Sequence, residues 1–138
     1  NPVSFMSRGN IYDARDDYDR AIADFDHAVM LDPAYAEAYN NRGSAFAKKG
    51  DYGRAIADFS KSLQLRPSAQ SYSNRGLAHV KAGNYAAAIK DLDEAVRRDP
   101  KDAAALYNRG VAKQNSSDKP AGDFDIAKAR QMDPGVGN

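Results

Sequence analysis

The chain has 138 residues, enough for one domain or a short stack of repeats. Its 20 basic and 19 acidic residues leave a formal net charge of +1, so no strong field favours nucleic acid or a membrane surface. The absence of cysteine excludes disulfides, thiolate metal sites and a cysteine nucleophile, and no apolar run approaches the roughly 18 residues of a membrane span.

An Arg-Gly pair recurs four times along the chain at a step of 33 or 34 residues. The pairs are Arg8-Gly9, Arg42-Gly43, Arg75-Gly76 and Arg109-Gly110. Prolines keep the same step at Pro33, Pro67, Pro100 and Pro134. A small-residue column holds Ala21, Ala55, Ala88 and Gly122, and a large apolar column holds Phe25, Phe59, Leu92 and Ile126. These columns predict tandem repeats at residues 2–35, 36–68, 69–102 and, degenerate, 103–134, followed by a tail of residues 135–138.

Each repeat is predicted to form two helices joined by a short turn. In residues 36–68, a first stripe at helical spacing consists of Tyr39, Gly43, Phe46 and Ala47. Gly50 then stands where a left-handed residue ends a helix. A second stripe consists of Tyr52, Ala55, Ile56, Phe59 and Leu63. Pro67 ends this second helix.

The turn between the helices has a good N-cap residue in every repeat. These residues are Asp17, Asp51, Asn84 and Asp118. In the last repeat, Lys113 replaces an aromatic residue and Lys119-Pro120 replaces Tyr-x. We still expect helices there, because proline is compatible with the first turn of a helix.

The second repeat resembles the tetratricopeptide repeat, with its aromatic–x6–aromatic, Ala–x3–Phe and closing Pro. The residues that carry the resemblance are Tyr39, Gly43, Phe46, Ala55, Phe59 and Pro67. The resemblance extends from about residue 2 to residue 134. It implies an all-α fold, a right-handed superhelical solenoid of stacked antiparallel helix pairs. Gly43 and Ala55 are expected to let neighbouring helices approach closely.

The arginine column departs from the family pattern, in which leucine is commoner before the glycine. An aspartate stands sixteen residues after each arginine, at Asp24, Asp58, Asp91 and Asp125. We favour a structural ladder in which each arginine binds an aspartate of its own or the preceding repeat, because a guanidinium can hold a carboxylate through two hydrogen bonds. The alternative is a row of arginines that face a groove and hold an acidic ligand.

The resemblance places the first helix of each repeat on a concave face. Asparagine precedes the arginine in three repeats, and an amide can bond a peptide backbone of any sequence. This row resembles the asparagine ladder of O-linked N-acetylglucosamine transferases. The candidate groove residues are Asn10, Asn40, Asn41, Ser44, Asn74, Tyr107 and Asn108. The alternative is a set of solvated helix residues without a ligand.

The carboxylate clamp by which some family members hold chaperone C-termini is not expected. Asn10 and Asn41 match its asparagines, but its cationic positions hold Met6, Gln70 and Asn74. Shifting the pattern by one repeat does not restore it.

No catalytic, cofactor or metal site is predicted. Neither His27 nor His79 has a metal-ligand partner three or four residues away, and His79 is expected to be a partly buried core residue in an aromatic column. The aspartate-rich strings lack the spacing of a calcium loop, and no phosphate-binding loop is present.

The favoured function is a non-catalytic protein–protein interaction module that binds an extended peptide or a partner helix in the concave groove. One alternative is a targeting or substrate-recruiting region of a larger enzyme or signalling protein. Another is a self-associating adaptor, a homo-oligomer formed through terminal repeats. Nucleic acid binding and membrane insertion are not expected. We expect a soluble protein, with the cytoplasm favoured over the bacterial periplasm.

Overall fold

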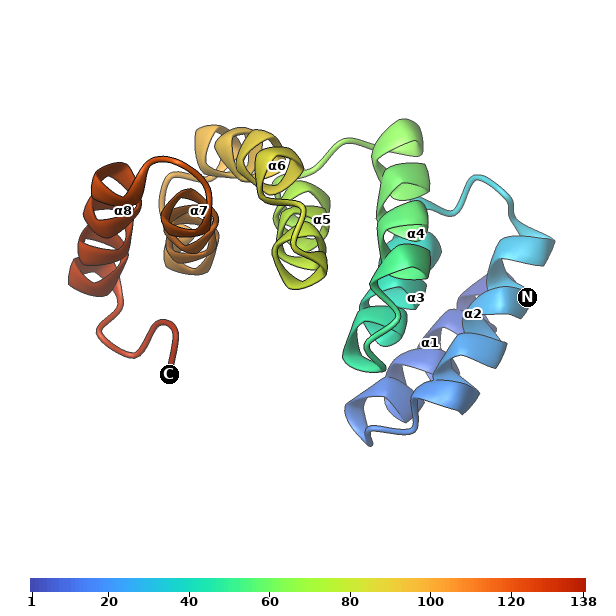
Figure 1. The fold of residues 1–138 in the computed structure, drawn as a ribbon. Helices are drawn as coiled ribbons and strands as arrows, with labels where there is room; N and C mark the ends of the chain where they lie inside the picture. The colour runs from blue at the N-terminus through green and yellow to red at the C-terminus, as the bar shows by residue number, and fades with distance from the viewer. The chain divides into compact units, whose positions relative to one another are not determined.

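The computed structural model describes residues 1–138, which form eight α-helices and no strands (Figure 1). In chain order the helices are α1 (Pro2–Ala14), α2 (Tyr18–Leu31), α3 (Ala36–Lys48), α4 (Tyr52–Leu65), α5 (Ala69–Ala82), α6 (Tyr85–Arg98), α7 (Ala103–Asn115) and α8 (Lys119–Met132). The all-α fold class is confirmed. None of these helices combines the length and the apolar character that crossing a membrane requires.

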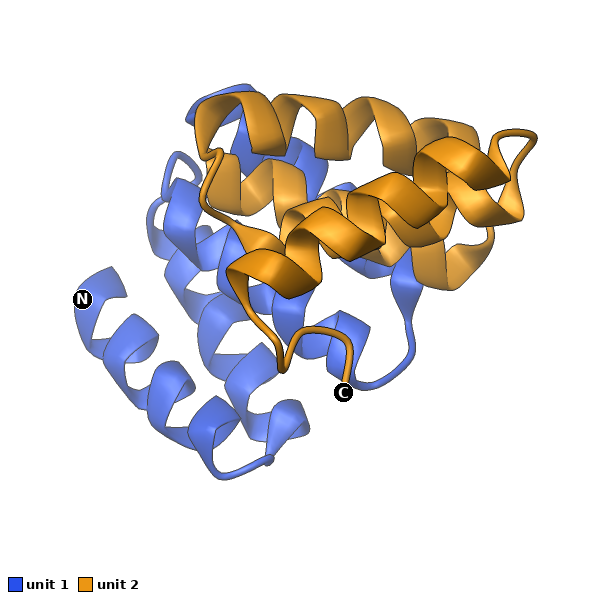
Figure 2. Cartoon of the chain, turned by 90° about the vertical axis from the view of Figure 1, so that its left-hand side faces the viewer, with its two compact units in different colours: residues 1–67 blue, residues 68–138 orange.

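The chain divides into two compact units, which Figure 2 colours separately. Unit 1 is residues 1–67, with α1 to α4, and unit 2 is residues 68–138, with α5 to α8. Within unit 1, α1 packs on α2, α2 on α3 and α3 on α4, and α1 also touches α3. Unit 2 repeats this order, with α5 also touching α7. In each unit the two odd-numbered helices therefore lie side by side and share one face.

The turns within the helix pairs follow the predicted cap chemistry with one exception. Asp17, Asp51 and Asp118 each accept a hydrogen bond from the backbone N–H three residues later, which satisfies an unpaired donor of the helix start. Asn84 is also an N-cap, but its side chain forms no such bond. Gly50 adopts the predicted left-handed conformation, with a φ of 82°.

The glycine that follows each arginine is required by the packing of its helix pair. A Cβ atom added to Gly43 would lie 2.9 Å from Cε1 of Phe59, and one added to Gly76 would lie 2.5 Å from Cγ of Leu92. Phe59 and Leu92 are almost fully buried. The large apolar residue of the second helix therefore occupies the space that the glycine of the first helix leaves open.

The fourth helix pair follows the same rule with smaller residues. A Cβ atom added to Gly122 would lie 2.6 Å from the backbone oxygen of Gly110, a closer approach than any side-chain adjustment could relieve. Gly122 stands in the alanine column of the other repeats. This departure from the pattern therefore lets α7 and α8 approach backbone to backbone.

The residues after α8 form a turn that packs on the last helix pair. The side chain of Asp133 accepts a hydrogen bond from the backbone N–H of Gly135 at 3.0 Å. Val136 is buried against Leu106 and Ala129. Residues 135–138 were predicted only as a tail, and their packing on the core was not predicted. Val136 covers part of α7 and α8 with an apolar side chain.

Candidate functional site

Each arginine of the repeated column lies within hydrogen-bond distance of the aspartate sixteen residues later. In Arg42, Nε donates to Asp58 Oδ2 at 2.8 Å and Nη2 donates to Asp58 Oδ1 at 2.8 Å. The same two-bond geometry joins Arg8 to Asp24, Arg75 to Asp91 and Arg109 to Asp125. All four aspartates are buried. Because buried carboxylates need partners, these arginines are engaged inside the helix pairs.

Two of these arginines also bind a carboxylate of the preceding helix pair. Arg42 Nη1 donates to Asp26 Oδ1 at 2.8 Å, so α3 is joined both to α4 and to α2. Arg109 Nη1 donates to Asp93 Oδ1 at 3.1 Å and joins α7 to α6 in the same way. The hydrogen bonds with Asp58 are the main cause that raises the pKa of Arg42.

In unit 2, a further basic residue stands beside two of the buried aspartates. Lys113 Nζ lies 2.9 Å from Asp125 Oδ2. Burial by itself would raise the pKa of Asp125, but hydrogen bonds from Arg109 and Lys113 outweigh burial and lower it. The lysine that replaces the aromatic residue in the fourth repeat therefore pairs with a buried carboxylate.

His79 occupies the equivalent position in the third repeat. Its Nε2 lies 3.8 Å from Asp91 Oδ2, and its Nδ1 is buried without a hydrogen-bond partner. Burial lowers the pKa of His79. The side chain is mostly buried, as the aromatic column predicts.

The shared face of the odd-numbered helices is polar in unit 1. Asn41 Nδ2 on α3 donates to Asn10 Oδ1 on α1 at 2.9 Å, so two of the predicted groove residues meet. Asn10 Nδ2 and Asn41 Oδ1 are not used by this bond. Asn40 and Ser44 are half-buried on α3. This face presents amide and hydroxyl groups that suit a peptide backbone.

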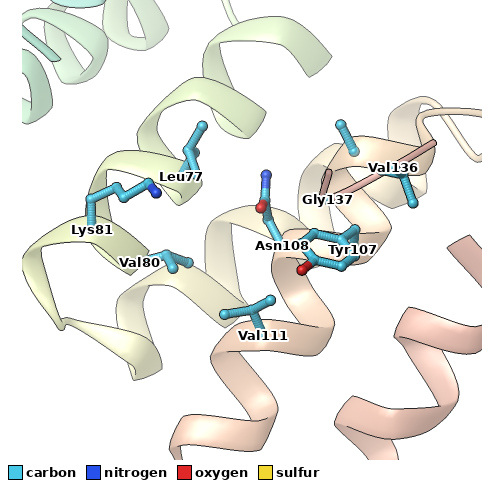
Figure 3. A pocket seen from close by; sticks show the side chains of 9 residues that line it. Leu77, Val80, Lys81, Tyr107, Asn108, Val111, Val136 and Gly137 are labelled. Atoms are coloured by element: carbon cyan, nitrogen blue, oxygen red, sulfur yellow. The ribbon is translucent and has the colours of Figure 1, made fainter. Parts of the chain in front are cut away.

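The corresponding face in unit 2 contains an open pocket of about 410 Å³ between α5 and α7 (Figure 3). Its lining residues are Leu77, Val80, Lys81, Ala104, Tyr107, Asn108, Val111, Val136 and Gly137. Figure 3 shows Val80 of α5 and Val111 of α7 on facing sides. Of the predicted groove residues, the pocket brings together only Tyr107 and Asn108, and Asn74 lies half-buried on α5.

Tyr107 is partly covered by the C-terminal turn. A Cβ atom added to Gly137 would lie 2.4 Å from Cζ of the Tyr107 ring. The guanidinium carbon of Arg130 lies 5.9 Å from the centre of the same ring, in a cation–π contact. The ring of Tyr107 is therefore held in place as part of the pocket wall.

The apolar residues that line the pocket were not among the predicted groove residues, which were chosen for their polar side chains. Asn10, Ser44, Leu77 and Val111 share one position of the repeat, which is polar in unit 1 and apolar in unit 2. This change along a single column was the sequence signal that could have located the pocket.

Three family models match the chain. A model described as TPR repeat matches residues 9–50, and models described as tetratricopeptide repeat match residues 36–68 and 73–112. The chain belongs to the tetratricopeptide repeat family. Members of this family are typically non-catalytic interaction modules, and about four repeats are present in this one.

Solved structures of tetratricopeptide repeat proteins are similar over nearly the whole chain. A MamA RS-1 ArsTM double mutant is 27% identical, with a TM-score of 0.89 over 96% of this chain and 75% of that one. MamA 41-end from Desulfovibrio magneticus RS-1 is 26% identical, with a TM-score of 0.90 over 96% of this chain and 76% of that one.

A third structure shows likeness of fold alone. The first TPR of Spaghetti (RPAP3), bound to an HSP90 peptide, is 24% identical, with a TM-score of 0.79 over 82% of this chain and 93% of that one. No curated protein matches the sequence.

Proposed function

We propose that this tetratricopeptide repeat protein is a non-catalytic interaction module with four repeats, residues 2–35, 36–68, 69–102 and 103–134. It holds an extended peptide or a partner helix against the face that the odd-numbered helices share within a unit. Asn10, Asn40, Asn41 and Ser44 contribute to this face in unit 1, and Asn74, Tyr107 and Asn108 contribute to it in unit 2.

The observation that carries the proposal is the pocket between α5 and α7. Its walls come from two successive repeats and include the amide of Asn108 among apolar side chains. A largely apolar pocket with a few polar groups is the usual form of a binding site. The arginines support the same conclusion indirectly. They pair with buried aspartates, so the ligand is expected to bind to other side chains.

A ligand held by scattered hydrogen bonds and modest apolar burial is expected to bind with a Kd on the order of micromolar. The test compares the parent chain with a variant in which Asn41, Asn74 and Asn108 are all alanine. Both serve as bait in lysate of the source cell, and each enriched partner is then measured by calorimetry as a purified protein. We expect the variant to lose about tenfold in affinity. Equal affinity would remove the asparagine row from the binding face.

A further inference from the structure

The pocket in unit 2 carries positive charge and no negative charge. Of the nine residues that line it, only Lys81 carries a formal charge, and the others are apolar, aromatic, amide or glycine. Lys81 is exposed on α5 and forms no salt bridge. The pocket is therefore lined mainly by apolar residues, exposes polar surface as well, and carries a single cation.

Comparison with unit 1 shows why this lysine differs. Lys48 and Lys81 occupy the same position of successive repeats. Lys48 Nζ lies 2.6 Å from Asp13 Oδ2, so its charge is neutralised by the preceding repeat. The residue that corresponds to Asp13 one repeat later is Ala47, which carries no charge. Lys81 is therefore a lysine at the same repeat position as Lys48, but it has no counterpart of the Asp13 carboxylate with which Lys48 pairs.

The size of the pocket limits its occupant. A volume of about 410 Å³ is at the lower end for ligand pockets, which span about 300–1,000 Å³. This suits one large apolar side chain with its adjoining backbone better than the whole face of a helix. Leu77 and Val80 of α5 and Val111 of α7 give the pocket apolar side chains from both helices, and Asn108 can bond the backbone that follows the inserted side chain.

We propose that this pocket binds an extended acidic peptide segment. A large apolar residue rests on Leu77, Val80 and Val111, and an aspartate or glutamate one or two residues away pairs with Lys81. This inference rests on the proposed function and specifies the ligand class of one part of the binding face.

The test selects short random displayed peptides against the whole chain and measures the enriched sequences by fluorescence anisotropy. We expect an apolar residue close to an acidic one to be enriched. Lys81→Gln should weaken such peptides about threefold and remove their preference for acid over amide. Leu77→Ser, which introduces the residue that α3 has at this position (Ser44), should weaken them about fivefold because apolar contact is lost. Lys48→Gln is the matched control and should leave binding unchanged.

Three outcomes would overturn the inference, and they have different consequences for the proposed function. Enriched peptides that lack the apolar–acidic pair and bind Lys81→Gln as well as the parent would leave the proposed function standing. Enrichment of no peptide would also contradict binding of extended peptides by the wider face. Equal losses in Lys81→Gln and Lys48→Gln would show a general charge effect and likewise overturn it.

Discussion

The two units have the same helix order but differ in the side chains that line the face of their odd-numbered helices. In unit 1 this face carries the Asn10–Asn41 hydrogen bond and the Lys48–Asp13 ion pair. In unit 2 it carries an apolar pocket with Lys81 at its edge. The scaffold of buried glycine contacts and Arg–Asp pairs is nevertheless the same in both. Residues that hold the helix pairs together are thus separate from residues that determine what the face presents.

The largest expected effect tests whether the Arg–Asp pairs stabilise both units. Asp125→Ala leaves Arg109 and Lys113 without their shared buried carboxylate, and we expect a loss of about 3 kcal/mol in the free energy of unfolding. Asp58→Ala should cost less, about 1–2 kcal/mol, because no lysine shares Asp58. The arginine keeps a second carboxylate in both variants, Asp26 for Arg42 and Asp93 for Arg109. Denaturant unfolding of the purified variants measures both.

A double variant serves as the control for this prediction. Replacing both Arg42 and Asp58 with leucine removes the charge together with its partner and should unfold much closer to the parent than Asp58→Ala does. If the single aspartate variants unfold at the parent's midpoint, the pairs contribute nothing to stability.

The next largest effect tests how closely α7 and α8 of unit 2 approach each other, with a glycine of unit 1 as the reference. Gly122→Ala places a methyl group 2.6 Å from the backbone oxygen of Gly110, so α8 must move away. We expect a loss of about 2 kcal/mol, measured as a lower midpoint of thermal unfolding. Gly53→Ala in unit 1 is the control, since its added Cβ meets nothing closer than 3.9 Å. A Gly122→Ala variant as stable as this control would contradict the backbone-to-backbone contact.

The smallest effect concerns an acid sensitivity that His79 gives to unit 2. Burial lowers the pKa of His79 in the folded state below the value of about 6.5 in the unfolded chain. At a pH between these two pKa values, the unfolded chain binds more protons than the folded protein does. Stability should therefore fall as pH drops from 7 towards 5, by less than about 1 kcal/mol.

His79→Phe introduces the residue that Phe46 provides in the second repeat and should flatten this part of the pH profile. Urea unfolding at several pH values compares the two chains. An unchanged slope in the variant would assign the acid sensitivity to other groups.

Many features of the fold could be predicted because they act within one helix pair. The same number of residues separates Gly43 from Phe59 and Gly76 from Leu92, so the same glycine-to-large-residue contact recurs in successive repeats. The Arg–Asp spacing follows the same logic. Asn84 is the N-cap of α6 as predicted, but its side chain forms no capping hydrogen bond, and residue type alone does not determine whether that bond forms.

The groove was harder to predict because it depends on which side chains meet between neighbouring repeats. Tyr107 and Asn108 were correctly assigned to the odd-numbered helices, but the contact of Gly137 with the Tyr107 ring depends on a turn with no helical periodicity. Leu77 and Val111 lie more than thirty residues apart, and only the packing of α5 beside α7 brings them to one pocket.

The amino-acid sequence by itself determined the helix pairs and their small-to-large contacts, since these depend on short fixed separations along the chain. It favoured Arg–Asp pairing but left open whether the aspartate belongs to the same or the preceding repeat. Only the tertiary structure decided that Asp26 and Asp93 join the arginines from the preceding pair, that Asn10 bonds Asn41, and that Val136 helps to wall a pocket. These contacts arise where separate helices and the C-terminal turn pack together, and no periodicity along the chain encodes that arrangement.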